Sequence, residues 1–257
     1  MQNVRLKVQT VQFRFFGALN DLLPLQKRRI WFAHSLYGQP AIKDTIESLG
    51  VPHTEVDCIL IHGKSVDLFY HPRYGDRIAV YSEYVSKRKK RIKHLNQCIF
   101  KTPRFILDSH LGKLARYLRL LGFDVLYQRE YLDQAIAHDA KRLERIVLTR
   151  DVGLLKNKII RHGYWMRKTN PKKQIKEVIK RFHLAKQIRP FRVCLECNGK
   201  IKKVAKKKIL KRLLPETKKY YRQFFQCNNC QKIYWQGTHF EKLRAFIMSV
   251  SKAVRNL

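Results

Sequence analysis

The architecture of the chain follows from residues 105–126, FILDSHLGKLARYLRLLGFDVL. A short apolar run, FIL, is followed by leucine and alanine at helical spacing until Gly122, where we expect the helix to end. FDVLY then predicts a second strand, residues near 133–143 a second helix, and RIVLT a third strand. Asn170 before Pro171 predicts the start of a further helix. Such alternation predicts an α/β fold with a parallel sheet flanked by helices.

Three aspartates occupy positions where a sheet of this kind binds ligands. Asp108 follows FIL, Asp151 follows RIVLTR, and Asp133 stands at the start of the second predicted helix. Open α/β sheets bind ligands at the carboxyl ends of their strands, and Mg²⁺ or Mn²⁺ prefers carboxylate and water oxygens. We therefore expect these aspartates to hold a divalent cation that promotes phosphodiester hydrolysis. Helix capping is the alternative role, and Asp139 is a candidate fourth ligand.

The distribution of charge predicts a polyanionic partner. Residues 87–257 hold 45 of the 55 Lys and Arg but 11 of the 19 Asp and Glu, so they carry +34 of the net +36. Basic side chains that neutralise phosphates release condensed counterions, which favours nucleic acid as the partner. An anionic membrane surface is the weaker alternative, because no stretch approaches the roughly 18 apolar residues of a spanning helix.

Two groups of basic residues are the expected RNA contacts. In the first group, which follows Asp108, the basic residues are spaced three apart. They form either a solvated face or a ridge that holds phosphates. The second lies in KIKKVAKKKILKRLL, residues 200–214, where a helix would bury Val204, Ile209, Leu210 and Leu213 and leave its lysines for nucleic acid. The expected RNA-binding residues are Lys113, Arg116, Arg119, Arg150, Lys206, Lys207, Lys208 and Lys211.

Two CxxC pairs predict a structural metal site. Their four thiolates, from Cys194, Cys197, Cys227 and Cys230, suit a tetrahedral Zn²⁺. A closed site of this kind has no open coordination position, so the zinc would fold the module rather than catalyse. A redox dithiol is the alternative. Aromatic residues around the second pair either form the core of the ribbon or stack on unpaired bases: Tyr220, Tyr221, Phe224, Phe225, Tyr234 and Trp235.

Residues 1–86 are nearly neutral and predict a separate small domain. Strand signals in VRLKVQTVQFRFFG, CILIHG and RIAVYSEY surround a short helix at 41–49, which is the pattern of a β-grasp fold. FRFFGALNDLL and the pair Gly75-Asp76 resemble the ubiquitin-like sulfur carriers. Those carriers act through a C-terminal Gly-Gly tail, whereas this fold continues past Ser86. We therefore expect a structural or docking module with a protein partner.

Four segments in order carry a resemblance to a known family. They are residues 105–126, then RIVLTRDVGLLK, CLECNGKI and CNNCQKIYWQGTHFEKL. Together they resemble the Mut7-C ribonuclease domain family, named after the Mut-seven exonuclease. The resemblance implies a PIN-like nuclease fold joined to a zinc ribbon, often behind an N-terminal ubiquitin-like domain. It also implies acidic metal ligands at Asp108, Asp133 and Asp151.

The chain departs from this family pattern at three positions. Gln128 and Ala135 stand where many relatives carry acids, and His110 stands where an apolar residue is usual. Fewer acids lower the expected metal affinity and catalytic rate. Two functions follow: a metal-dependent ribonuclease with water as its nucleophile, or a non-catalytic RNA-binding protein. Transfer, ribosomal or other structured RNA is the expected partner of either.

The expected organisation is a β-grasp domain at 1–86, a basic linker at 87–102, a PIN-like nuclease domain at 103–189, and a zinc ribbon with a basic insert and a C-terminal helix at 190–257. The linker contains KRKKRIK, which serves either as a spacer or as an RNA contact. The start of the chain lacks the apolar core of a signal peptide, so we expect a cytoplasmic protein with thiols rather than disulfides. Cys58 is expected in a core, Cys98 has no assigned role, and His239 is expected at the surface or in packing.

Overall fold

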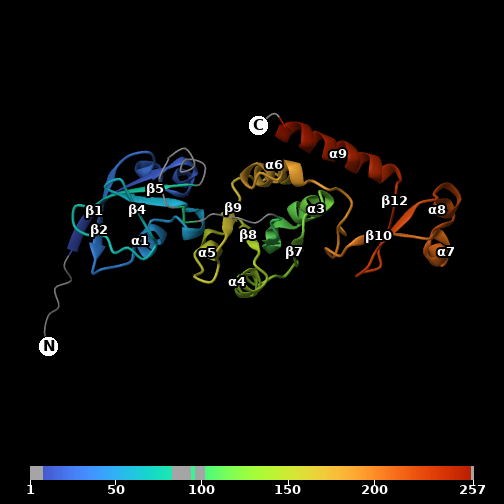
Figure 1. Cartoon of the computed structure of the whole chain (residues 1–257), viewed down its shortest axis with the longest axis horizontal. Helices are drawn as coiled ribbons and strands as arrows, with labels where there is room; N and C mark the ends of the chain where they lie inside the picture. The colour runs from blue at the N-terminus through green and yellow to red at the C-terminus, as the bar shows by residue number, and fades with distance from the viewer. Residues whose placement is uncertain (1–7, 83–93, 96–101, 256–257) are drawn as a thin grey trace. The chain divides into compact units, whose positions relative to one another are not determined.

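The computed structural model of the chain describes residues 8–82, 94–95 and 102–255 (Figure 1). The chain forms two compact units. The first unit comprises residues 1–100, 137–143 and 151–165, and the second comprises residues 101–136, 144–150 and 166–257. The KRKKRIK block and Cys98 lie outside the described residues, and so does the side chain of His239.

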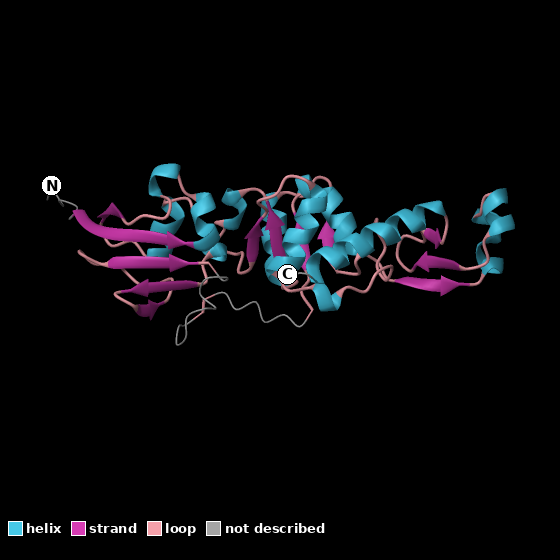
Figure 2. Cartoon of the chain, turned by 90° about the horizontal axis from the view of Figure 1, so that it is seen from above, coloured by secondary structure: helices cyan, strands magenta, loops and turns pink. Residues whose placement is uncertain are grey.

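The N-terminal sheet has the strand order β2-β1-β5-β3-β4, and its strands lie side by side in Figure 2. Strand β1 is parallel to β5 and antiparallel to β2. Alternate residues of β1, Val11, Phe13 and Phe15, are buried with Ile46 of the helix, because successive side chains of a strand point to opposite faces. This arrangement confirms the predicted β-grasp fold. Its elements are β1 (Val8–Phe16), β2 (Phe32–Tyr37), α1 (Ile42–Ser48), β3 (Cys58–Ile61), β4 (Lys64–Val66) and β5 (Arg77–Tyr81).

The first unit also contains a later segment with helix α5 (Val152–Leu155) and strand β9 (Gly163–Trp165). A turn of the β-grasp fold binds this segment through buried polar groups. The amide of Trp165 donates to Oε1 of Glu55 at 2.7 Å, and Nε2 of His53 donates to the carbonyl oxygen of Ile160 at 2.9 Å. Glu55 and His53 are both buried. Polar contacts therefore join two stretches that are far apart in the sequence.

The second unit is built on the parallel strands β7, β6 and β8, which pair in that order. A helix connects each strand to the next along the chain, as the sequence predicts (Figure 1). Asn170 caps the following helix by accepting from the amide of Lys172 at 2.9 Å. The elements are β6 (Phe105–Leu107), α3 (Gly112–Leu120), β7 (Val125–Tyr127), β8 (Ile146–Thr149) and α6 (Pro171–Arg181). Helix α4 (Asp133–Arg142) begins in this unit, and its residues from 137 on are counted in the first.

A small antiparallel sheet with the order β10-β11-β12 forms the C-terminal ribbon. Its core consists of Ile209, Leu213 and Phe224. Helix α9 (Thr238–Arg255) leaves the ribbon and lies beside α6 (Figure 1). None of the helices in the described part is long and apolar enough to cross a membrane. The ribbon elements are β10 (Ile201–Val204), α7 (Lys206–Ile209), α8 (Pro215–Tyr220), β11 (Phe224–Cys227) and β12 (Ile233–Trp235).

Residues 200–214 do not form the single helix that the sequence analysis considered for them. Residues 201–204 form β10, because Ile201 pairs with Cys227 and Val204 with Phe224 in the ribbon sheet. A single helical turn, α7, follows the strand. Ile209 and Leu213 are buried as expected, but Leu210 is 44% exposed. The apolar spacing was correct for a short turn, and it did not reveal the strand pairing.

Gly122 ends α3 at a point where the chain leaves no room for a side chain. Its φ is +93°, and a Cβ atom on it would lie 2.0 Å from the carbonyl oxygen of Arg189. The next segment is fixed there because the amide of Arg189 donates to the carbonyl oxygen of Leu121 at 2.9 Å. Gly122 therefore allows residues near 189 to pack against the end of the helix.

We predict that Gly122→Ala destabilises the protein more than Gly63→Ala. Both glycines have positive φ, but a Cβ atom on Gly63 meets nothing within 4 Å. The comparison therefore separates backbone strain from steric overlap. The overlap at Gly122 should add about 1–3 kcal/mol to the loss of unfolding free energy. Thermal unfolding followed by circular dichroism measures the difference. Equal losses in the two variants would contradict the close approach at Arg189.

Candidate functional site and metal centre

Asp108 follows the middle strand, β6, and its carboxylate is buried, with the residue 5% exposed. Its Oδ1 accepts from the amide of His110 at 2.8 Å and caps the 3₁₀ turn Ser109–Leu111. Its Oδ2 accepts from the hydroxyl of Thr149 and from the amide of Arg150 at 3.3 Å. The carboxylate therefore caps its own turn and also faces the end of β8.

The strand register places the ends of three strands at one edge of the sheet. Leu107 pairs with Tyr127 on one side and with Leu148 on the other. Strands β6 and β8 are therefore neighbours, and Asp108 lies beside the end of β8. Asp133 is exposed and begins α4, in the connection that leaves β7. Asp108 and Asp133 thus both belong to connections that leave the carboxyl edge of this sheet.

Asp151 comes two residues after β8 and is counted in the first unit. Its side chain is exposed and accepts from the amide of Gly153 at 2.6 Å, which caps α5. The capping role that the sequence left open is thus present, and a metal-binding role stays a prediction. Asp139 accepts from the guanidinium of Arg142 at 2.5 Å.

Residues 8–82, 94–95 and 102–255 contain one group of three or more potential metal ligands. It consists of the four cysteines. All four Sγ atoms lie within 4.8 Å of one another. The Sγ atoms of Cys194 and Cys230 are 3.5 Å apart, and those of Cys197 and Cys227 are 3.4 Å apart. A tetrahedral ion with Zn–S bonds of about 2.3 Å needs sulfur separations of about 3.8 Å. The cluster therefore suits a metal ion such as zinc.

The two CxxC loops share one backbone geometry. In the first, the amide of Asn198 donates to the carbonyl oxygen of Cys194 at 3.1 Å, and the amide of Cys194 donates to the carbonyl oxygen of Gly199 at 2.8 Å. The second loop repeats both bonds around Cys227, at 3.2 and 2.9 Å. Asn198 and Gln231 occupy the same place in their loops, with φ of +67° and +60°. Each loop thus turns back and presents both of its sulfurs to one point.

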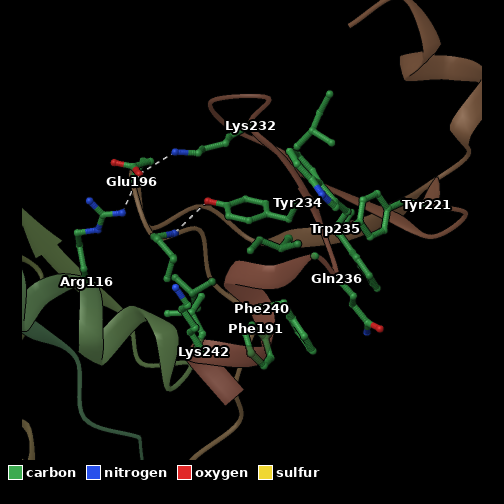
Figure 3. Close-up of a pocket in the computed structure, with 17 residues that line it drawn as sticks. Arg116, Phe191, Glu196, Tyr221, Lys232, Tyr234, Trp235, Gln236, Phe240 and Lys242 are labelled. Carbon is green, nitrogen blue, oxygen red and sulfur yellow. Dashed lines mark hydrogen bonds and ion pairs between the residues drawn. The ribbon is translucent and has the colours of Figure 1, made fainter. Parts of the chain in front are cut away.

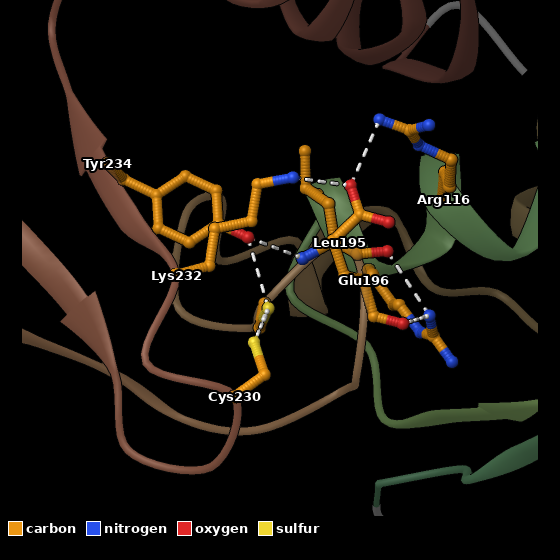
Figure 4. A network of polar contacts seen from close by, with 8 residues as sticks. Arg116, Leu195, Glu196, Cys230, Lys232 and Tyr234 are labelled. Carbon is orange, nitrogen blue, oxygen red and sulfur yellow. Dashed lines mark hydrogen bonds and ion pairs between the residues drawn. The ribbon is translucent and has the colours of Figure 1, made fainter.

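Local donors favour the thiolate form of Cys197, whereas burial raises the pKa of Cys227 and of Cys230. Burial opposes ionisation of Cys197, but the amide of Gly199 and the neighbouring thiols lower its pKa to about 6. The hydroxyl oxygen of Tyr234 accepts from the amide of Leu195 at 3.2 Å, which leaves its hydrogen for Sγ of Cys194 at 3.0 Å (Figure 4). Burial, followed by the contact with Cys194, raises the pKa of Tyr234, so this hydroxyl remains a donor.

Arg119 was predicted to contact RNA, and this prediction is wrong because the residue is 3% exposed. Its Nη1 donates to the carbonyl oxygens of Leu195, at 3.1 Å, and Glu196, at 2.6 Å. Its Nε and Nη2 donate to the carbonyl oxygen of Val125 at 3.1 and 2.9 Å. The guanidinium therefore fastens the first CxxC loop to the end of α3 and to β7. Lys113 and Arg116 are exposed on the same helix, as expected.

A second polar group holds the first CxxC loop against the sheet. Oδ1 of Asn198 accepts from the amide of Val125 at 2.8 Å, and its Nδ2 donates to Asp124 at 2.6 Å. Asp124 also accepts from Arg145 at 2.8 and 3.1 Å. Burial opposes ionisation of this carboxyl, but Arg145 and Asn198 hold its pKa below the ordinary value. Asp124 therefore has a structural role.

The predicted RNA contacts outside α3 divide into two kinds. Nζ of Lys206 donates to the carbonyl oxygens of Lys218 and, at 3.0 Å, Tyr221, so this ammonium has a structural role within the ribbon. The other predicted contacts remain exposed and keep RNA binding as a prediction: Arg150, Lys207, Lys208 and Lys211.

Sequence reasoning missed the links between the ribbon and the sheet, although two signals were present. Arg119 comes four residues after Ala115 and directly after Leu118, so helical spacing places it on the buried face. Asn198 directly follows a CxxC pair, where a left-handed residue is needed, and asparagine tolerates that conformation. The partners of these side chains are distant in sequence and required the structure.

Two family models match the chain. The one described as Mut7-C RNAse domain matches residues 103–247, which is more than half of the chain, and the one described as Mut7-C ubiquitin matches residues 8–88. None of the curated proteins matches the chain. Two crystal structures of small archaeal modifier protein 1 from Haloferax volcanii are similar at 15% identity. The first covers 29% of this chain and 97% of that one with a TM-score of 0.24, and the second covers 28% and 93% with a TM-score of 0.23.

We predict that Cys227→Ser removes the bound metal and destabilises the ribbon, because a structural zinc site contributes directly to folding. Cys58→Ala is the control, since Cys58 is buried in the β-grasp fold and is not part of the cluster. Elemental analysis should find zinc in the wild type and in Cys58→Ala but not in Cys227→Ser. Equal zinc content in all three proteins would exclude this metal centre.

We predict opposite outcomes for two arginines that lie three residues apart on α3. Arg119→Ala leaves buried carbonyl groups without donors and should cost about 2–4 kcal/mol of unfolding free energy. Arg116→Ala removes an exposed ion pair with Glu196, 3.5 Å long, and should cost less than about 1 kcal/mol. Denaturant unfolding measures both changes. A loss at Arg119 no larger than that at Arg116 would contradict its role as a link.

Proposed function

Because the chain belongs to the Mut7-C RNase domain family, we propose that it is a metal-dependent ribonuclease that hydrolyses RNA phosphodiesters at the carboxyl edge of the β6 sheet. The family supports a nuclease-like function. We further propose Asp108, Asp133 and Asp151 as the ligands of the divalent cation, Mg²⁺ or Mn²⁺. Structured RNA, such as transfer or ribosomal RNA, is the proposed substrate.

The observation that carries this proposal is the buried carboxylate of Asp108. A buried carboxylate is costly unless it is paired or hydrogen-bonded, and this one is held by uncharged donors, the hydroxyl of Thr149 and the amides of His110 and Arg150. These donors fix the orientation of the carboxylate without placing a cation against it. A carboxylate oriented in this way, at the carboxyl end of the middle strand, is suited to bind a cation from solution.

The donor chemistry of the three aspartates fits Mg²⁺ or Mn²⁺. Mg²⁺ keeps several of its waters and uses one or two carboxylates together with substrate phosphates, so the ligands need not form a closed cage like that of the cysteines. When bound, the ion would activate a water and neutralise charge on the phosphate. The chain itself would orient Asp108 through Thr149 and offer the exposed Lys113 and Arg150 to RNA phosphates.

The proposed substrate follows from charge. Residues 87–257 carry a net charge of +34, and the exposed Lys207, Lys208 and Lys211 extend this charge onto the ribbon. Such contacts supply affinity for any RNA and weaken as salt rises. They do not supply catalysis, which rests on the aspartates.

A non-catalytic RNA-binding protein is the second candidate. It is favoured by the exposed positions of Asp133 and Asp151 and by the helix-capping bond of Asp151. Gln128 and Ala135, which stand where the family resemblance leads us to expect acids, are exposed as well. The high positive charge fits stable binding to a large RNA as well as it fits turnover. For the β-grasp fold we propose a docking role toward a protein partner.

We predict that Asp108→Asn abolishes Mn²⁺-dependent RNA cleavage, because it removes the charged ligand that the site orients. Glu144→Gln is the control, since Glu144 is an exposed acid that lies before β8, at the opposite end of that strand. Cleavage of structured and single-stranded RNA, measured beside RNA affinity, distinguishes the two candidates. Cleavage that persists in Asp108→Asn would assign the activity to another site or a contaminant. Tight binding without cleavage by any of the proteins would favour the non-catalytic function.

A further inference from the structure

A pocket of about 680 Å³ lies between strand β12 and the start of α9 (Figure 3). Its volume is within the range of small-molecule sites. The walls are rich in aromatic rings, of which Tyr234 also contacts the cysteine cluster through its hydroxyl. These rings belong to Phe191, Tyr221, Phe225, Tyr234, Trp235 and Phe240. All of them, and all the other lining residues, lie in the second unit.

Part of this aromatic wall is accessible rather than packed. Trp235 is 37% exposed, and its ring lies 6.4 Å from that of Tyr221 at an interplanar angle of 49°. Gly237 lets the chain pass close to both rings, because a Cβ atom there would lie 3.0 Å from Nε1 of Trp235 and 3.3 Å from the hydroxyl of Tyr221. The rings therefore have free area for a flat partner.

Charged residues stand among the lining residues of this pocket. They are the basic Arg116, Lys232 and Lys242 and the acidic Glu196. Glu196 is 2.7 Å from Lys232 and 3.5 Å from Arg116, so its single charge is shared by two cations (Figure 4). The lining therefore keeps a net positive charge, which complements an anionic ligand.

We propose that this pocket binds an unpaired base of single-stranded RNA, with the sugar-phosphate backbone at the basic residues. The inference rests on the proposed function and extends it by naming the form of RNA that is recognised. Aromatic stacking beside a cationic groove is the general means by which proteins bind single strands. A base within a duplex is already stacked on its neighbours, so the pocket selects unpaired segments. A neutral apolar partner would gain nothing from the three cations.

The position of Arg116 connects this pocket to the proposed nuclease site. Arg116 lines the pocket and lies on α3, the helix that begins four residues after Asp108. Because the ribbon is fastened to α3 and β7 by Arg119, the pocket is fixed relative to that helix. A strand held by its base in the pocket would have its backbone beside α3.

The test compares binding of the full chain to three probes without added Mg²⁺ or Mn²⁺. The probes are a short oligouridine, an abasic ribose-phosphate strand of equal length and a blunt RNA duplex, followed by fluorescence anisotropy. Trp235→Ala should weaken oligouridine binding by about fivefold to a hundredfold, the range of one stacked base, and leave abasic binding unchanged. Trp235→Phe should restore most of the affinity. Tyr74→Ala is the matched control, because Tyr74 is a 79% exposed aromatic residue of the β-grasp fold and lies outside the pocket.

Zinc content shows in each case that the ribbon remains folded. Equal affinity of the wild type for oligouridine and the abasic strand, or equal affinities of the wild type and Trp235→Ala, would overturn the inference and leave the pocket to a protein partner. If the wild type still cleaves RNA in that case and Asp108→Asn does not, the proposed nuclease function holds and only the pocket inference is rejected. Loss of base-selective binding in Trp235→Ala, without cleavage by the wild type, would support the pocket and reject the nuclease.

Discussion

The buried guanidinium of Arg119 is the interaction on which the second unit depends. It donates to the carbonyl oxygen of Val125 in β7 and to those of Leu195 and Glu196 in the first CxxC loop. One side chain thus satisfies backbone carbonyl groups from the sheet and from the metal centre. The ribbon is therefore fixed to α3, and the aromatic pocket and the lysine-bearing insert are held with it.

Several of the few acids in the second unit have a structural role. Asp124 pairs with Arg145, Glu196 pairs with Lys232, and Glu177 accepts from the amides of Arg167 and Lys168. Asp108 differs, because uncharged donors orient it within the fold. In a region of net charge +34, a buried carboxylate held by neutral groups retains its own charge for a ligand. This distinction supports Asp108 more strongly than its place in the sequence does.

Much of the fold was predictable from local patterns. The leucine spacing of α3, the cap at Asn170 and the alternation of β1 are properties of neighbouring residues, and each is confirmed. The two CxxC pairs likewise predicted the four-cysteine cluster. The predicted RNA contact of Arg119 was wrong because a carbonyl partner 76 residues away holds that side chain. The helix considered for residues 200–214 does not form as one element, because residues 201–204 pair as a strand. Neither leaves a periodic signal in the chain.

The sequence by itself determined the order of the strands and helices, the excess of positive charge, the thiolate set and the family, since all of these are carried by residue type and spacing. Only the tertiary structure decided that Asp108 is buried against Thr149, that Lys206 is used within the ribbon, and that aromatic residues of separate segments line one pocket. The physical reason is that burial and hydrogen-bond partners depend on which distant segments meet. Residue type sets what a side chain can do, and its neighbours in space decide which of those roles it has.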